Sequence, residues 1–116
     1  MRNSRDGVFR ACGDRAISVI SASELLHGVH RAADEGVRAR RQAFVEHVLA
    51  VLDPLPITTR VARAHARLWA DLERSGAVIG SHDLWIAATA LAHGLPVATA
   101  NARHFERVPG LAVVAV

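Results

Sequence analysis

The sequence has no lysine and a single cysteine among its 116 residues. The lone Cys12 excludes a framework of disulfides within the chain and a cluster of thiolate metal ligands. Sparse use of cysteine is typical of proteins in reducing compartments, and we therefore expect a cytoplasmic location.

Long apolar runs are also missing. The first apolar stretch, AISVISA at residues 16–22, is too short to form the core of a signal peptide or to span a bilayer. We therefore expect no membrane partner.

Three motifs of common catalytic folds are absent. The sequence has no GxGxxG fingerprint for dinucleotides, no GxxxxGK[ST] loop for nucleoside triphosphates and no serine nucleophile elbow. These absences argue against an enzyme that uses a nucleotide cofactor and give no support to a serine hydrolase.

The residues that are present predict one folded domain. A hydrophobic content of 51% and a charged content of 22% are typical of globular proteins, and 116 residues suffice for one sizeable core. All 14 basic residues are arginine, and the formal net charge is +3. Because arginine binds phosphate well, a phosphate-bearing partner is one interpretation. The base composition of the genome is the other.

Strand and helix patterns alternate along the chain. Residues 1–15 have no clear period, and we expect a loose lead-in there, followed by one domain over residues 16–116. The expected strands are residues 16–21, 55–58, 95–100 and 111–116. Helices are expected to follow caps at Ser21 or Ser23, at Thr58 or Thr59 and at Ser81, with a further helix over residues 37–52. Pro54 and Gly94 are expected to end two of them.

This order predicts an α/β fold, with a parallel sheet and helices on both faces. Ligands of such sheets bind outside the carboxyl ends of the strands. Glu24 follows the first expected strand, in the first turn of its helix, and Asn101 follows the strand LPVATA. Asp83 lies in the first turn of a helix that is apolar nearly all round.

Two carboxylates and an amide oxygen at one edge of a sheet would suit a hard divalent cation such as Mg²⁺. A simpler interpretation also exists for each residue. Acids in the first turn of a helix stabilise it by about 0.3–1 kcal/mol, and asparagine is common in turns. Spacing alone favours the simpler interpretation for each residue taken singly.

Two longer stretches carry a family resemblance. AISVISASELLHGVHRA at residues 16–32 and IGSHDLWIAATALAHGLPVATANARHFERVPGL at residues 79–111 strongly resemble PIN-domain toxins of the VapC type. The resemblance extends from about Ala16 to the last residue. It implies a PIN-like three-layer sandwich and a Mg²⁺-dependent endoribonuclease that hydrolyses RNA. It also implies a cognate antitoxin protein that holds the enzyme inactive, and a homodimer.

The resemblance implies roles for single residues as well. Glu24 matches the acid of the family motif SELxxG, and Asp83 matches the acid of DLxIAATA; both would hold Mg²⁺, or Mn²⁺ in its place. Asn101 matches the position after the VxT strand, where it would orient a water bound to the metal or a second metal ion. His104 stands where relatives often carry another acid.

One family motif has no match in the sequence. PIN toxins begin with a strand of the form hhDTxxh, in which h is apolar and the aspartate is the first catalytic acid. Asp6 and Asp14 have the wrong neighbours for it. We therefore expect a PIN-like sheet whose central first strand is missing, because of a misassigned start or a shortened gene. The alternative function is a catalytically impaired remnant that binds the antitoxin or dimerises.

Other charged and aromatic residues have two interpretations each. Arg60, Arg63, Arg67 and Arg74 share one helix face, which would bind RNA phosphates or, as we favour, is simply solvated. Arg38, Arg40 and Arg41 form a similar, weaker cluster. Trp69 and Trp85 are more typical of core or dimer contacts than of platforms for bases.

Two histidines lie close to the expected site in sequence. His27 has helical metal-ligand spacing with Glu24 and His30, but no second such pair exists, and we expect His27 to be a packing residue or one that supports a metal ligand without binding the metal. His82 precedes Asp83, and exposure in the capping turn is its simpler interpretation.

Overall fold

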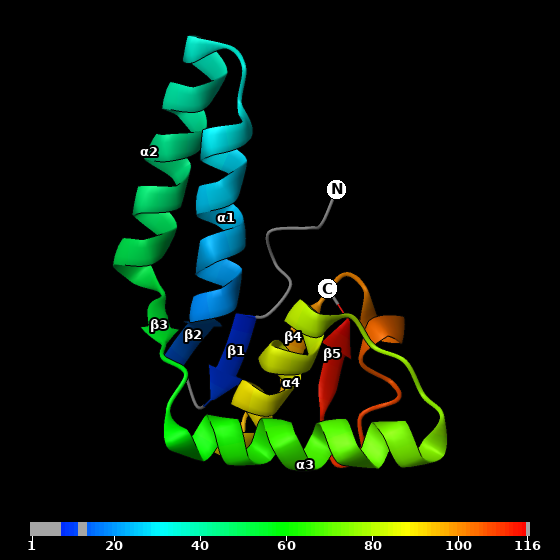
Figure 1. Cartoon of the computed structure of the whole chain (residues 1–116). Coiled ribbons are helices and arrows are strands. Elements are labelled where there is room, and N and C mark those ends of the chain that lie inside the picture. Colours follow the sequence, from blue (N-terminus) through cyan, green and yellow to red (C-terminus); the bar gives the residue numbers. More distant parts are fainter. Residues whose placement is uncertain (1–7, 12–13, 116) are drawn as a thin grey trace.

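The computed structural model describes residues 8–11 and 14–115, with side chains from residue 16 onward. In these ranges one mixed sheet is covered by four α-helices (Figure 1). The strands are β1 (Val8–Ala11), β2 (Asp14–Ser18), β3 (Asp53–Leu55), β4 (Val97–Thr99) and β5 (Val113–Ala115). The helices are α1 (Val19–Arg31), α2 (Glu35–Val51), α3 (Thr59–Ser75), α4 (Ser81–His93) and the short 3₁₀ helix η1 (Ala102–His104). The prediction of an α/β fold is confirmed.

The strand order is β3-β2-β1-β4-β5. The outer pairs β2–β3 and β4–β5 are parallel, as predicted, whereas β1 is antiparallel to both of its neighbours. Only two residues separate β1 from β2 in sequence, and a connection that short can join only antiparallel strands. The sheet is therefore mixed.

Strand β1 corrects two expectations. Residues 1–15, expected to be a loose lead-in, include β1 and the first two residues of β2. The centre of the sheet, expected to lack a strand, is occupied by β1 between β2 and β4. Pairing on both sides of β1 satisfies the backbone groups that an interrupted sheet would leave unpaired.

The first helix begins earlier than predicted. Strand β2 ends at Ser18, whose Oγ accepts a hydrogen bond from the backbone N–H of Ile20 at 3.0 Å, and α1 begins at Val19. The β-branched residues of AISVIS favoured a strand to Ser21, but the cap at Ser18 prevails. Glu24 therefore lies in the second turn of α1, and the prediction of a first-turn position is wrong.

The next connection is also shifted toward the N-terminus. Asp34 caps α2 through hydrogen bonds from the N–H groups of Gly36 and Val37, so Gly36 lies inside the helix. The following strand is Asp53–Leu55 and not residues 55–58. It tolerates Pro54 because β3 is an edge strand, where one N–H can be absent from the ladder.

Helices α3 and α4 are close to prediction. Thr58 caps α3, with its Oγ1 accepting from Val61 N–H at 3.3 Å. Gly94 ends α4 with a φ of 64°, a left-handed conformation that favours glycine. The cap of α4 is Gly80, and not Ser81.

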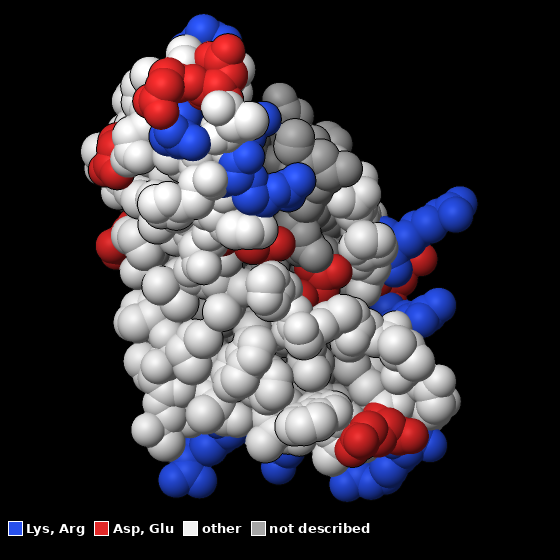
Figure 2. Space-filling model, turned by 45° about the horizontal axis from the view of Figure 1, so that its top comes forward, with Lys and Arg blue, Asp and Glu red and all other residues white. Residues whose placement is uncertain are grey.

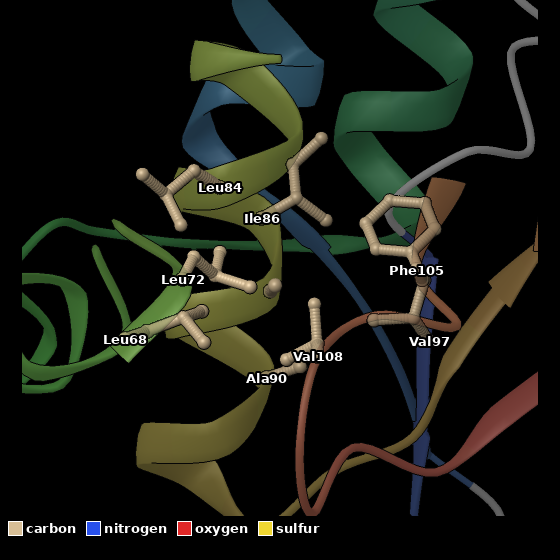
Figure 3. Close-up of a cluster of buried hydrophobic side chains, with 9 residues drawn as sticks. Leu68, Leu72, Leu84, Ile86, Ala90, Val97, Phe105 and Val108 are labelled. Atoms are coloured by element: carbon tan, nitrogen blue, oxygen red, sulfur yellow. The ribbon is translucent and has the colours of Figure 1, made fainter. Parts of the chain in front are cut away.

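Helix α4 forms the middle of the core. It lies between α3 and the sheet. There Ile86, Ala87 and Ala90 are fully buried against side chains of α3, of β4 and of residues 105–108, which follow η1 (Figure 3). The alanines let neighbouring elements approach closely, so the helix is buried on nearly all sides, as its sequence predicted. None of the helices in the described ranges could cross a bilayer, since each is too short or too polar.

Candidate active site at the start of helix α4

The structure places Asp83 in the first turn of α4, with only 3% of its surface exposed. The partial positive charge at the start of a helix stabilises a carboxylate there. The cap residue is Gly80, which has no side chain to offer to the first N–H groups of this helix. The N-terminal end of α4 is therefore a favourable place for negative charge.

Asp83 is in contact with η1. The Nδ1 atom of His104 lies 3.1 Å from Asp83 Oδ2, within hydrogen-bond range, and the His104 side chain is about half exposed. Because one Asp83 oxygen is held in this way, the direction of the carboxylate is fixed. His104 occupies the position where the resemblance implies an acid, and here an imidazole takes that place.

Glu24 reaches the same end of α4 from helix α1. Its Oε2 atom lies 3.6 Å from Nδ1 of His82, the residue that precedes Asp83. This distance is too long for a hydrogen bond, but it permits an ion pair when the imidazole is protonated. The Glu24 side chain is 23% exposed, and its Oε1 atom is buried. The carboxylate of Glu24, on α1, thus lies beside the residue that directly precedes Asp83 in α4.

Asn101 lies directly beyond β4 and caps η1, three residues before His104. Its backbone N–H donates to Thr99 Oγ1 at 2.9 Å, which folds the chain back at the carboxyl end of the strand. Asn101, which is partly exposed, thus lies in the turn between β4 and His104, the residue whose ring contacts Asp83.

The number of candidate metal ligands at the start of α4 is small. Among the described residues, no group of three or more His, Cys, Asp or Glu side chains is arranged to hold a metal by itself. Mg²⁺ needs less than this, because it keeps several waters and is usually bound by one or two carboxylates and substrate phosphates. Glu24 and Asp83 fit that limited requirement, whereas they do not form a closed cage.

The sequence did not identify the two histidine contacts. His82 is 58% exposed, as its capping-turn interpretation predicts, yet it also lies beside Glu24. Its position directly before Asp83 was the available signal. The expectation that His27 is a packing residue is wrong, since the His27 side chain is exposed.

The arginines of α3 are all exposed, and they lie along the lower edge of the molecule in Figure 2, where α3 runs. Arg74 pairs with Asp71 at 2.7 Å. This agrees with the solvated-face interpretation. Trp69 is 54% exposed, so it is not a core residue, whereas Trp85 is partly buried between α3 and α4.

Comparisons with known proteins agree with the fold and with the quoted motifs. The model of the family described as "PIN domain" matches residues 4–111. Ribonuclease VapC1 of Rickettsia felis is 39% identical over 104 residues, which is 90% of this chain and 78% of the relative. A tRNA(fMet)-specific endonuclease VapC of Salmonella typhimurium is 35% identical over 84% of this chain and 71% of its own.

A solved structure is similar as well. VapBC-5 of Mycobacterium tuberculosis, a member of the VapBC family of toxin–antitoxin systems, superimposes with a TM-score of 0.77 and 38% identity. The match covers 87% of this chain and 81% of that chain.

Proposed function

The chain belongs to the PIN-domain family, and we propose that it is a Mg²⁺-dependent endoribonuclease, the toxin of a type II toxin–antitoxin pair. The observation that carries the proposal is the position of Glu24, which reaches from α1 to His82 of α4, the residue directly before the buried Asp83. Relatives named as a ribonuclease, at 39% identity over 90% of the chain, and as a tRNA endonuclease, at 35% identity over 84%, support the reaction class. Mn²⁺ is an alternative cation with the same preference for oxygen.

A bound divalent cation supplies Lewis acidity, which makes a water more acidic and offsets charge on the scissile phosphate. Glu24 and Asp83 would hold this cation through their carboxylate oxygens. His104 would keep Asp83 in one orientation through the 3.1 Å contact. Asn101 would use its side-chain amide to orient the attacking water. The nucleophile is water, so no side chain of the chain becomes covalently attached to RNA.

The partners follow from the same family membership. VapBC-5 is described as a member of a toxin–antitoxin family, which supports a cognate antitoxin for this chain. A homodimer and a cytoplasmic location complete the proposal.

Cleavage of RNA by the purified chain tests the site. We expect cleavage with Mg²⁺, none with EDTA, and a loss of about 100-fold or more for Asp83→Asn and for Glu24→Gln, since metal catalysis contributes several kcal/mol. Asp71→Asn is the matched control, because Asp71 is an exposed acid paired only with Arg74 on α3, and it should cleave normally. Undiminished cleavage by either site variant would show that the site is wrong.

A second candidate is a non-catalytic binding module. The absence of a closed group of three ligands among the described residues favours it. In that case the purified chain would bind its antitoxin but would not cleave RNA with Mg²⁺ or Mn²⁺. The Asp83→Asn variant would bind the antitoxin as tightly as the parent chain does.

A further inference from the structure

A cleft of about 490 Å³ lies between α3 and the start of α4, beside the loop of residues 76–80. Its volume is in the range of small-molecule sites. It opens on the α3 side of α4, where Ser81, Leu84 and Trp85 line it. Asp83 is two residues from Trp85, about 200° around the helix, and therefore lies on the other side of α4. The cleft and the carboxylates are separated by about one helix diameter, roughly 10 Å.

The cleft has an aromatic wall. The rings of His65 and Trp85 are stacked, with centroids 3.5 Å apart and planes inclined by 14°. Trp69 meets His65 edge-on at 5.8 Å and 63° and remains half exposed. The stack is thus already formed, and the Trp69 ring is left with a surface on which a planar ligand can lie.

Two polar groups are set into this wall. His65 is only 8% exposed and, among the described residues, makes ring contacts without a hydrogen bond. Burial lowers the pKa of His65, so the ring is neutral at pH 7 and offers one donor and one acceptor. Glu73, one turn beyond Trp69 in α3, adds two acceptor oxygens at the rim.

This chemistry selects among occupants. An apolar side chain in the cleft would cover the ring nitrogens of His65 without satisfying them, which is the costly way to bury polar groups. A heteroaromatic base satisfies them at its edge while its face stacks on tryptophan, as bases of single-stranded RNA do on aromatic side chains.

We propose that this cleft binds a guanine base of single-stranded RNA, stacked on Trp69 and recognised by Glu73 and His65. Guanine carries two adjacent N–H donors on one edge, which match the two oxygens of a carboxylate, and acceptors that match an imidazole N–H. The inference rests on the proposed function, because the same strand would carry the scissile phosphate past Asp83.

Arg107 supports the position of a strand at this opening. Its Nη1 atom donates to the backbone carbonyl of Val78 at 2.8 Å, and Val78 lines the cleft. The contact holds the guanidinium, which is exposed, against the cleft wall. A cation so placed suits the phosphate next to the bound base.

Tryptophan fluorescence provides a direct test, because the only two tryptophans of the chain both line the cleft. The full chain is titrated with GMP, AMP, CMP and UMP in EDTA, so that no catalysis occurs. We expect GMP to quench the fluorescence and to bind roughly tenfold more tightly than the other three, the usual discrimination of a bidentate contact. Glu73→Gln should lower the affinity for GMP to that for AMP.

Two further variants make the test independent of one substitution. Trp69→Leu should weaken all four nucleotides, with Trp85 as the remaining reporter. Asp71→Asn lies on the same helix outside the cleft and should bind as the parent does. Absence of quenching by every nucleotide, or an unchanged GMP preference in Glu73→Gln, would overturn the proposal.

A second copy of the chain is the competing occupant. If sedimentation without nucleotide shows a dimer that Trp69→Leu converts to monomer, the cleft is a protein interface and the proposal is overturned. If the chain cleaves RNA but does not bind GMP, the guanine-binding proposal is wrong and the proposed catalytic function stands. If the chain binds GMP but does not cleave RNA, the proposed catalytic function is wrong and the guanine-binding proposal stands.

Discussion

The two helical hairpins of the protein are packed very differently. Helix α4 buries eight of its 13 residues, whereas α2 buries only Val45 among 17. The reason is position: α4 lies between α3 and the sheet, whereas α1 and α2 project from the sheet and contact it only near their base (Figure 1). On this projecting arm, Phe44 and Val51 are more than half exposed.

The difference bears on the candidate site because each region contributes one acid. Asp83 belongs to the densely packed helix and is fixed by its surroundings as well as by His104. Glu24 belongs to the arm, in the second turn of α1, near the point where the arm joins the body. The site therefore combines a rigid half with a half whose position depends on how α1 packs against α4.

The sharpest contrast should come from core truncations. Ile86→Ala in α4 removes a fully buried side chain and should lower the free energy of unfolding by about 2–5 kcal/mol. Phe44→Ala on the arm should cost less than about 1 kcal/mol, because the ring is 52% exposed. Urea titrations of both variants measure the two values. Equal losses would show that the arm is packed as firmly as the core.

Glycine substitutions should differ in sign between the two regions. Gly94→Ala places a Cβ at a positive φ of 64° and should destabilise by about 1–2 kcal/mol. Gly28→Ala lies inside α1, where a Cβ meets no atom within 4 Å, and should stabilise by roughly 0.5–1 kcal/mol. Thermal unfolding of the pair provides the measurement, and destabilisation by Gly28→Ala would contradict the open environment of the arm.

The smallest expected effect is the pH dependence of stability, and it comes from His65 in the densely packed part formed by α3 and α4. Burial lowers the pKa of His65 in the folded state below its ordinary value near 6.5, so the unfolded chain binds this proton more readily. Stability should therefore fall as the pH decreases below about 6.5 and should gain nothing further from His65 above it.

The substitution His65→Phe removes this titratable group, so its protonation no longer contributes to the stability. The stability of the variant should decline less than that of the parent between pH 7.5 and 5.5, as measured by denaturation at each pH. Phe44→Leu on the arm, which adds and removes no titratable group, should keep the slope of the parent. A steeper decline for His65→Phe would contradict the sign of the shift.

Local chemistry made some features predictable. Thr58, one of two candidate caps, and Gly94, the expected terminator, act on backbone groups within their own turns, and such local effects can be read from a sequence. The apolar circumference of α4 predicted its burial, since a helix without a polar face can be stable only inside a core. The same logic failed at Ser18 and Val19, where a capping serine outweighs β-branched residues that favour a strand.

Other features depend on contacts between distant residues. Strand β1 has little pattern of its own, and its place in the centre follows from pairing with β2 and β4. The approach of His104 to Asp83 joins residues 21 positions apart, and the cleft joins α3 to α4. Neither the hydrophobic periodicity nor the secondary-structure propensity of a sequence specifies contacts between residues so far apart in the chain.

The amino-acid sequence alone determined the class of fold, the start of α3, the end of α4 and the identity of the candidate acids, because propensity, capping and motif act over a few residues. The tertiary structure alone decided the antiparallel centre of the sheet, the histidine beside each acid and the aromatic cleft. These depend on how separate segments pack, and packing energies are shared among residues that the chain brings together only on folding.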